Sequence, residues 1–178
     1  MNDEQSQVVW QGAFWRLRVT PFPLPDGRML ERGAIEHPGS VVLVPLLGQG
    51  PQFEVLMLRQ YRFALQETIL ELPAGTRDWD EAWLTCARRE LREETGYAAA
   101  RFTLLGSIWP APGLSDESMA LYLAQELRKD PLPADADEVI EVQPMPLDTL
   151  VAMAKDGRLR DGKSIVGIMR AAAHLGIW

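Results

Sequence analysis

Short stretches in which apolar and polar residues alternate dominate the first forty positions. Residues 8–19 alternate in part, with Phe14 and Trp15 among the apolar positions, and residues 28–36 follow as another predicted strand after a turn that contains proline and glycine. Alternation with a period of two is typical of strands that bury one face. The pattern predicts an antiparallel β-meander over residues 1–39. Its aromatic side chains cover either this chain's own core or a second copy of the chain.

The remaining residues, 40–178, alternate between predicted strands and predicted helices and form the second unit. Residues 40–47 (SVVLVPLL) are continuously apolar, as in a central strand buried on both faces, and Pro45 is expected at an edge or at the strand's end. Further strands are predicted at 53–61, 102–108, 119–127 and 139–145, and helices at 81–95, 147–155 and 165–175, the last capped by Ser164. This order predicts an α/β protein, an α/β/α sandwich over a mixed sheet, that carries the N-terminal meander as an elaboration.

The predicted helix at residues 81–95 concentrates the candidate chemistry. Successive residues of a helix are about 100° apart, so Glu90, Glu93 and Glu94 share one face. Three carboxylates held together repel one another unless a cation lies among them, and their hard oxygens suit Mg²⁺ or Mn²⁺. Glu81 lies near the opposite side of the helix wheel, so we expect it to orient other groups rather than to bind the metal.

Two glycines flank this helix. Gly96 follows its last residue, where a left-handed conformation commonly ends a helix, and Gly75 lies in the turn that leads into it. A backbone carbonyl in that turn, such as that of Ala74, is a further candidate metal ligand. Two arginines at the end of another predicted strand, Arg59 and Arg62, are candidate diphosphate contacts, because guanidinium groups pair bidentately with phosphate. The alternative for both is an ordinary surface arginine.

Composition narrows the classes of partner. The 178 residues include 18 basic and 25 acidic side chains, a net charge of −7, which argues against a nucleic acid as the main partner. No apolar run approaches the roughly 18 residues of a membrane span. The polar start, MNDEQSQ, is unlike a secretory signal, so we expect a cytoplasmic protein. The single cysteine, Cys86, excludes an intramolecular disulfide and is expected to be buried in the core.

From residue 75 to residue 97 the sequence resembles the Nudix box. Five residues separate Gly75 from Glu81, seven more lead to Arg89-Glu90-Leu91, and Glu93-Glu94 and Gly96 follow in register. Only Tyr97 departs from the motif, where the family usually has an aliphatic residue. Most Glu/Arg-rich helices are solvated faces with supporting ion pairs. A match of so many residue types over one window favours a metal site over that alternative.

Stretches outside the box are similar to the ADP-ribose pyrophosphatase branch of the Nudix family. They are EHPG at 36–39, RQYR at 59–62, ELPAG at 71–75, PGLSDE at 112–117 and the acidic stretch at 137–142. The resemblance implies a hydrolase that uses Mg²⁺, with Mn²⁺ as the alternative, to cleave the diphosphate bond of ADP-ribose into AMP and ribose 5-phosphate. GDP-mannose, or another nucleoside diphosphate sugar, is the alternative substrate. A non-catalytic ADP-ribose sensor is a further alternative, against which the retained box glutamates argue.

The resemblance also implies roles for individual residues of the helix and the loop after it. Glu90 and Glu94 correspond to the main metal ligands, Glu93 shares in the site, and the Ala74 carbonyl completes it. Glu138 corresponds to a loop glutamate that acts as the catalytic base or as an extra metal ligand. Relatives often carry another acid two residues before that position, where this chain has alanine, so either Glu138 acts alone or Glu93 or Glu141 shares the role of base.

Substrate contacts and assembly are implied in the same way. Arg62 and Arg59 correspond to residues that hold the diphosphate or the nucleoside, and Glu117 to a residue that contacts the terminal ribose. Arg32 is a candidate for the base pocket, together with aromatic residues of the meander. Members of this branch are typically homodimers that exchange N-terminal sheets, which would assign the meander to dimerisation.

Overall fold

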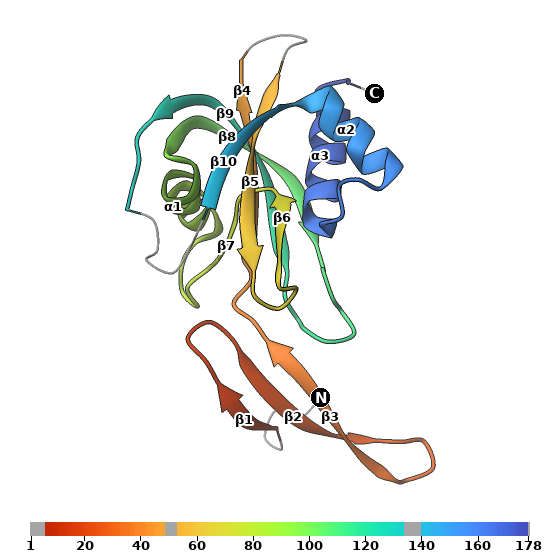
Figure 1. The fold of residues 1–178 in the computed structure, drawn as a ribbon. Helices are drawn as coiled ribbons and strands as arrows, with labels where there is room; N and C mark the ends of the chain where they lie inside the picture. Colours follow the sequence, from red (N-terminus) through yellow and green to blue (C-terminus); the bar gives the residue numbers. More distant parts are fainter. Residues whose placement is uncertain (1–5, 49–52, 134–139, 178) are drawn as a thin grey trace.

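The computed structural model describes residues 6–48, 53–133 and 140–177, which form a layered body and a separate small sheet. In the body, α1 (Trp83–Thr95) covers one face of a central sheet, while α2 (Leu147–Asp156) and α3 (Gly162–His174) cover the other (Figure 1). The predicted α/β/α sandwich is therefore confirmed. In the described part of the chain, no helix is both long enough and apolar enough to cross a membrane.

The central sheet is mixed, as the sequence predicts. Its order is β10-β5-β4-β9-β8, with β6 added beside β5 and β7 beside β4. Only the pairing of β4 with β9 is parallel among the described strands of the sheet. The bounds are β4 (Ser40–Leu47), β5 (Glu54–Arg62), β6 (Glu67–Glu71), β7 (Ala74–Thr76), β8 (Tyr97–Ile108), β9 (Met119–Lys129) and β10 (Ile140–Pro146).

Strand β4 is central because both of its faces are apolar. Val41 and Leu43 pack in the core beneath α1, whereas Val42 and Val44 pack in the core beneath α2 and α3. Alternate residues of a strand point to opposite faces, so a continuous apolar run supplies both cores. Pro45 does not mark an edge. Pairing with β9 ends at Pro45 and pairing with β5 begins one residue later, so the missing amide hydrogen falls between two ladders.

The helices begin at positions that differ slightly from the prediction. Helix α1 begins at Trp83, with Ala82 as N-cap and no side-chain cap, because Glu81 forms part of the preceding turn. It ends at Gly96, whose φ of 75° is the left-handed cap that the sequence predicts. Helix α3 begins at Gly162, and Asp161 rather than Ser164 is its cap, because the Asp161 carboxylate accepts the amide of Ser164.

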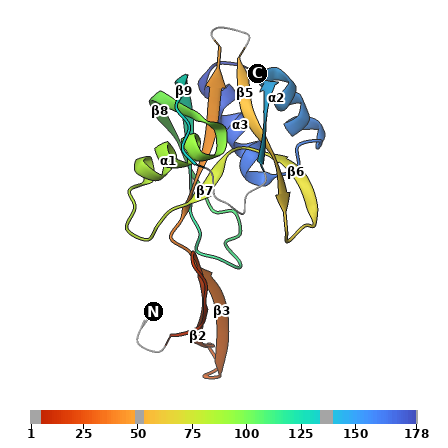
Figure 2. The same ribbon diagram turned by 60° about the vertical axis from the view of Figure 1, so that its left-hand side comes forward.

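The N-terminal meander is a three-stranded antiparallel sheet of β1 (Gln7–Gln11), β2 (Arg16–Pro23) and β3 (Met29–Glu36). It projects from the body in both views (Figures 1 and 2). Ile35 links it to the loop before β9, since its amide donates to Leu114 and its carbonyl accepts from Asp116. Its aromatic side chains stay largely exposed in the single chain, among them Trp10, Phe14, Trp15 and Phe22. Its role in dimerisation stays a prediction.

Candidate active site

Strand β7 runs against the glutamate face of α1. The amide of Ala74 donates to Oε2 of Glu94 at 2.8 Å. A Cβ atom added to Gly75 would lie 1.8 Å from the carboxyl carbon of Glu90, so this backbone must carry no side chain for the carboxylate to fit. Glu90 and Glu94 are 8% and 6% exposed, which is unusual for glutamate unless it is paired or binds a cation.

Arg89 joins three of the glutamates. Its Nη1 donates to Glu90 Oε1 at 2.7 Å and to Glu93 Oε2 at 2.9 Å, while its Nε and Nη2 donate to the two carboxylate oxygens of Glu81 at 3.1 and 2.9 Å. The hydrogen bond to Glu81 is the main cause that raises the pKa of Arg89, and the contacts with Glu90 and Glu93 add to it. The hydrogen bond from Arg89 in turn lowers the pKa of Glu81. Glu81 therefore orients Arg89, in agreement with the orienting role expected for it.

The residues present fit a hard divalent cation by their chemistry. The donors on this face are carboxylate oxygens, which Mg²⁺ and Mn²⁺ prefer, and the absence of a side chain at Gly75 leaves the space that the Glu90 carboxylate occupies. Within residues 6–48, 53–133 and 140–177, however, no three acidic, histidine or cysteine side chains already converge as a ligand set. The guanidinium of Arg89 lies between Glu90 and Glu93 instead. The metal roles of Ala74, Glu90, Glu93 and Glu94 stay predictions.

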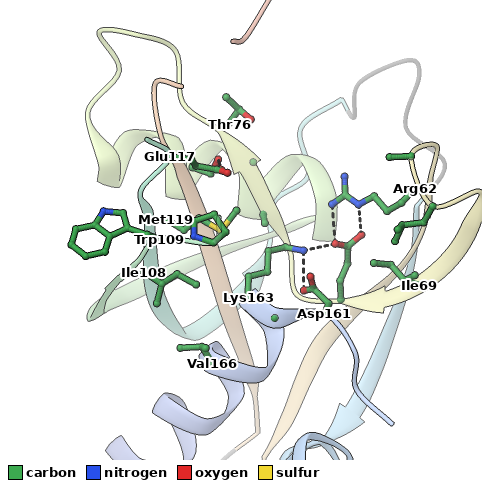
Figure 3. A pocket seen from close by; sticks show the side chains of 18 residues that line it. Arg62, Ile69, Thr76, Ile108, Trp109, Glu117, Met119, Asp161, Lys163 and Val166 are labelled. Atoms are coloured by element: carbon green, nitrogen blue, oxygen red, sulfur yellow. Dashed lines mark hydrogen bonds and ion pairs between the residues drawn. The ribbon is translucent and has the colours of Figure 1, made fainter. Parts of the chain in front are cut away.

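A pocket of about 750 Å³ adjoins the other side of β7, a size suited to a small-molecule ligand (Figure 3). Its polar wall comes from the ends of β5 and β6 and the start of α3, and its apolar wall from the β8–β9 segment. Its lining includes Arg62, Glu71, Ala74, Gly75, Thr76, Ile108, Trp109, Glu117, Met119, Asp161 and Lys163. Strand β7 therefore lines the pocket on one side and contacts the carboxylates of α1 on the other.

Buried ion pairs form the polar wall. Glu71 is fully buried, and its carboxylate accepts Nε and Nη2 of Arg62 at 2.7 and 2.9 Å and also the Nζ of Lys163. Lys163 donates in turn to Asp161 at 2.9 Å. Although burial acts to lower it, the hydrogen bonds and charge of Glu71, with the charge of Glu94, hold the pKa of Arg62 above its ordinary value. Arg62 thus lies within the electrostatic field of the α1 glutamates.

Glu117 lies on a different side of the pocket from Arg62 (Figure 3). Its Oε1 accepts the Ser40 hydroxyl at 2.6 Å and lies 3.8 Å from Nδ1 of His37. The loop that carries it is fixed at its base, because the amide of His37 donates to the Asp116 carboxylate at 2.8 Å. The structure therefore brings Arg62 and Glu117, which are 55 positions apart in the sequence, to one pocket.

Two predicted site residues are not brought to this pocket, and a third cannot be placed. Arg59 is exposed and lies three positions before Arg62 on β5, so its side chain leaves the opposite face of the sheet. Arg32 is exposed on β3, in the projecting N-terminal sheet. Glu138 lies outside the described residues. The contributions of all three stay predictions.

Sequence reasoning missed Glu71, Asp161 and Lys163. Glu71 belongs to the ELPAG stretch, but a glutamate at a strand end gives no sign that it is buried. Asp161 and Lys163 flank the start of α3, where the aspartate reads as a cap and the lysine as a surface charge. The sequence Asp161-Gly162-Lys163 at the start of the last predicted helix was the available signal. It points to the pocket only once the start of α3 is known to lie against Glu71, at the end of β6.

The family model of the NUDIX domain matches residues 36–166, which include β4 through the first residues of α3 and therefore both the glutamate helix and the pocket. The chain belongs to the Nudix hydrolase family. Nudix hydrolases act on phosphoric anhydrides and generally require divalent metal ions, which agrees with the oxygen donors on α1.

Three known Nudix relatives are similar over most of the chain. The methanol dehydrogenase activator of Bacillus methanolicus is 31% identical over 92% of this chain and 88% of its own length. The ADP-ribose pyrophosphatase of Bacillus subtilis (strain 168) is 32% identical over 91% of this chain and 87% of its own. The GDP-mannose pyrophosphatase of Yersinia enterocolitica is 33% identical over 72% of each chain.

One solved structure shows the same Nudix fold. The crystal structure of an ADP compounds hydrolase superposes with a TM-score of 0.80 and covers 96% of this chain and 91% of its own, at 20% identity. Because the match covers 96% of this chain, the structural similarity includes the N-terminal sheet.

Proposed function

We propose that this Nudix hydrolase cleaves the diphosphate bond of ADP-ribose with water, which gives AMP and ribose 5-phosphate. The observation that carries the proposal is the position of β7, which has the α1 glutamates on one side and the pocket on the other. Support for the substrate comes from the similarity to the Bacillus subtilis ADP-ribose pyrophosphatase over nine-tenths of the chain.

Each wall of the pocket has a distinct task in this proposal. Arg62 binds the diphosphate, because a guanidinium offers two parallel donors to phosphate oxygens. Glu117 accepts hydrogen bonds from ribose hydroxyls, and the Ser40 hydroxyl fixes the orientation of its carboxylate. The apolar side chains of Ile108, Trp109 and Met119 exclude water from the sugar.

The glutamates of α1 supply the reacting end of the site. Glu90, Glu93 and Glu94, with the Ala74 carbonyl, would hold Mg²⁺, which when bound neutralises the diphosphate and lowers the pKa of a bound water. Arg89 holds Glu90 and Glu93 at a fixed separation. Glu138 is the proposed base that takes the proton from the attacking water, with Glu93 as the alternative.

A panel of substrates tests the reaction. Purified protein with MgCl₂ is incubated with ADP-ribose, GDP-mannose, NADH and diadenosine polyphosphates, and the products are treated with phosphatase to release phosphate. The highest kcat/KM is expected for ADP-ribose. Faster cleavage of GDP-mannose would support the second candidate, which the Yersinia relative favours, and equal rates on all four would contradict both. Binding of ADP-ribose without turnover would indicate a sensor.

We also propose that two copies exchange their N-terminal sheets and that the enzyme works in the cytoplasm. Exposed aromatic residues on a projecting sheet support the dimer, and the single buried cysteine agrees with a reducing compartment. Sedimentation equilibrium of the whole chain is expected to give twice the mass of 20.0 kDa. The double variant Trp10→Ser/Phe14→Ser is expected to shift it toward the single mass, and a monomeric wild-type protein would contradict the proposal.

A further inference from the structure

Lys163 is almost enclosed in the polar wall of the pocket, although lysine is normally an exposed residue. Its side chain is 10% exposed, and its Nζ donates to Glu71 and, at 2.9 Å, to Asp161. It stands one residue into α3, 92 positions from Glu71. Both of these hydrogen bonds go to carboxylates, so the charge of Lys163 first balances the charges of Glu71 and Asp161.

Glu71 is shared between two cations that approach from different sides (Figure 3). Its Oε1 accepts Nε of Arg62, while its Oε2 accepts both Nη2 of Arg62 and Nζ of Lys163. With its side chain 1% exposed, this carboxylate has no solvent to compensate it, so its charge must be balanced by these two groups. Among the residues that the structure describes, removal of Lys163 would leave Arg62 as the one cation paired with Glu71.

Removal of Lys163 would leave Asp161 with other hydrogen-bond donors. Its Oδ2 still accepts the amide of Ser164 at 3.1 Å as well as the Ser164 hydroxyl, and its side chain is 17% exposed. The effect of losing Lys163 therefore falls on Glu71 and, through it, on Arg62. The side chain of Arg62 is 38% exposed, so part of its guanidinium is open to a ligand.

We infer that Lys163 is a positioning residue, which acts through Glu71 to keep the guanidinium of Arg62 available to the diphosphate of the substrate. By taking part of the Glu71 charge, Lys163 prevents that carboxylate from drawing Arg62 wholly into an ion pair. The inference rests on the proposed function, in which Arg62 binds the diphosphate. Helix α3 thereby takes part in substrate binding, although it lies far from the Nudix box in the sequence.

A double-mutant cycle between Lys163 and Glu71 tests this role. The probe is α,β-methylene-ADP-ribose, whose binding is measured by calorimetry, alongside KM and kcat for ADP-ribose. Lys163→Met is expected to raise Kd and KM about tenfold while kcat changes less than about twofold, since a misplaced binding group weakens ground-state and transition-state binding alike. In the Glu71→Gln background the carboxylate that Lys163 and Arg62 share is gone, so Lys163→Met is expected to change Kd by less than about twofold.

Two controls separate this role from others. Lys155→Met removes an exposed positive charge from α2 and is expected to leave Kd unchanged. Thermal melting of every variant shows whether the fold persists, and Glu71→Gln/Lys163→Met, which carries no unpaired buried carboxylate at this site, is expected to melt near Glu71→Gln alone.

Each remaining outcome decides against the inference. An equal rise in Kd in both backgrounds would mean that Lys163 touches the ligand itself, and unchanged Kd in Lys163→Met would mean that it only stabilises the fold. If the wild-type protein fails to bind the analogue, the proposed function fails and the inference with it. If the wild-type protein binds the analogue but the variants do not follow the expected pattern, the inference alone fails and the proposed function stands.

Discussion

Gly75 lies against Glu90 so closely that a single methyl group would displace the glutamate, because an added Cβ would be 1.8 Å from its carboxyl carbon. The adjacent residue of β7, Ala74, holds Glu94 by its amide. A three-residue strand thus fixes two glutamates that are four positions apart on α1. The contact of β7 with α1, and not the helix alone, therefore determines where the carboxylates of Glu90 and Glu94 lie.

Gly75→Ala is therefore expected to lower kcat/KM by about 100-fold, since displacement of about 1 Å in a reacting group has effects of that size. Circular dichroism is expected to show an unchanged fold. The control is Gly33→Ala, where the added Cβ would meet only a Leu17 methyl at an ordinary 3.8 Å, and full activity is expected. Full activity of Gly75→Ala would show that Glu90 has no fixed position to lose.

Glu94→Gln tests the metal role of the buried glutamate. The amide keeps the size of the side chain but removes its charge, so turnover at saturating MgCl₂ is expected to fall at least about 100-fold, with weaker Mn²⁺ binding by electron paramagnetic resonance. Glu54→Gln, at an exposed position of β5, is the matched control and should change neither quantity. Retained turnover in Glu94→Gln would count heavily against the proposed site.

Arg89→Ala tests the group that separates the glutamates. Without the guanidinium, Glu81, Glu90 and Glu93 lose charged hydrogen bonds, and unfolding by urea is expected to show a loss of about 1–3 kcal/mol, moderated by the partial exposure of Arg89. MgCl₂ is expected to restore more stability to this variant than to the wild type, because a cation can replace the missing charge. Arg88→Ala removes the same charge from an exposed position of α1 and is expected to leave the free energy of unfolding nearly unchanged.

Glu36 gives the N-terminal sheet a defined response to acid. Hydrogen bonds from Arg16, opposed by burial and reinforced by Arg18, lower the pKa of Glu36 from 4.5 to about 2. A depressed folded-state pKa contributes stability that is complete above pH 4.5 and is lost as the pH falls toward 2. The protection factors of the β2 and β3 amides, which correct hydrogen exchange for the pH dependence of its intrinsic rate, are expected to fall over that window. In Glu36→Gln these protection factors should already be low at pH 6, and any step that remained between pH 4.5 and 2 would contradict the assignment.

Much of the fold could be predicted because its signals are local. The continuous apolar run at 40–47 indicates a strand buried on both sides, and the structure confirms it. Gly96 ends α1 as predicted, since only the residues next to it decide that ending. Helix α1 begins two residues later than predicted, at Trp83, because Glu81 belongs to the preceding turn and Ala82 is the N-cap.

The site could be predicted only where its residues are close in sequence. Spacing alone places Glu90 and Glu94 on one face of a helix. It cannot show that Lys163 meets Glu71, since that contact depends on how α3 packs beside β6. Nor can it show that Arg59 and Arg62, neighbours in one motif, leave the sheet on opposite faces, unless the strand is known to continue through both.

The loop between β8 and β9 belongs mechanically to two parts of the molecule. Ile35, at the base of the projecting sheet, is hydrogen-bonded to it on both sides, and one position beyond Asp116 the same loop presents Glu117 to the pocket. The projecting sheet and the Glu117 side of the pocket are thus joined through one loop. A displacement of the sheet, as by a docked second subunit, would reach Glu117 through that loop, whereas Arg62 lies on β5, outside it.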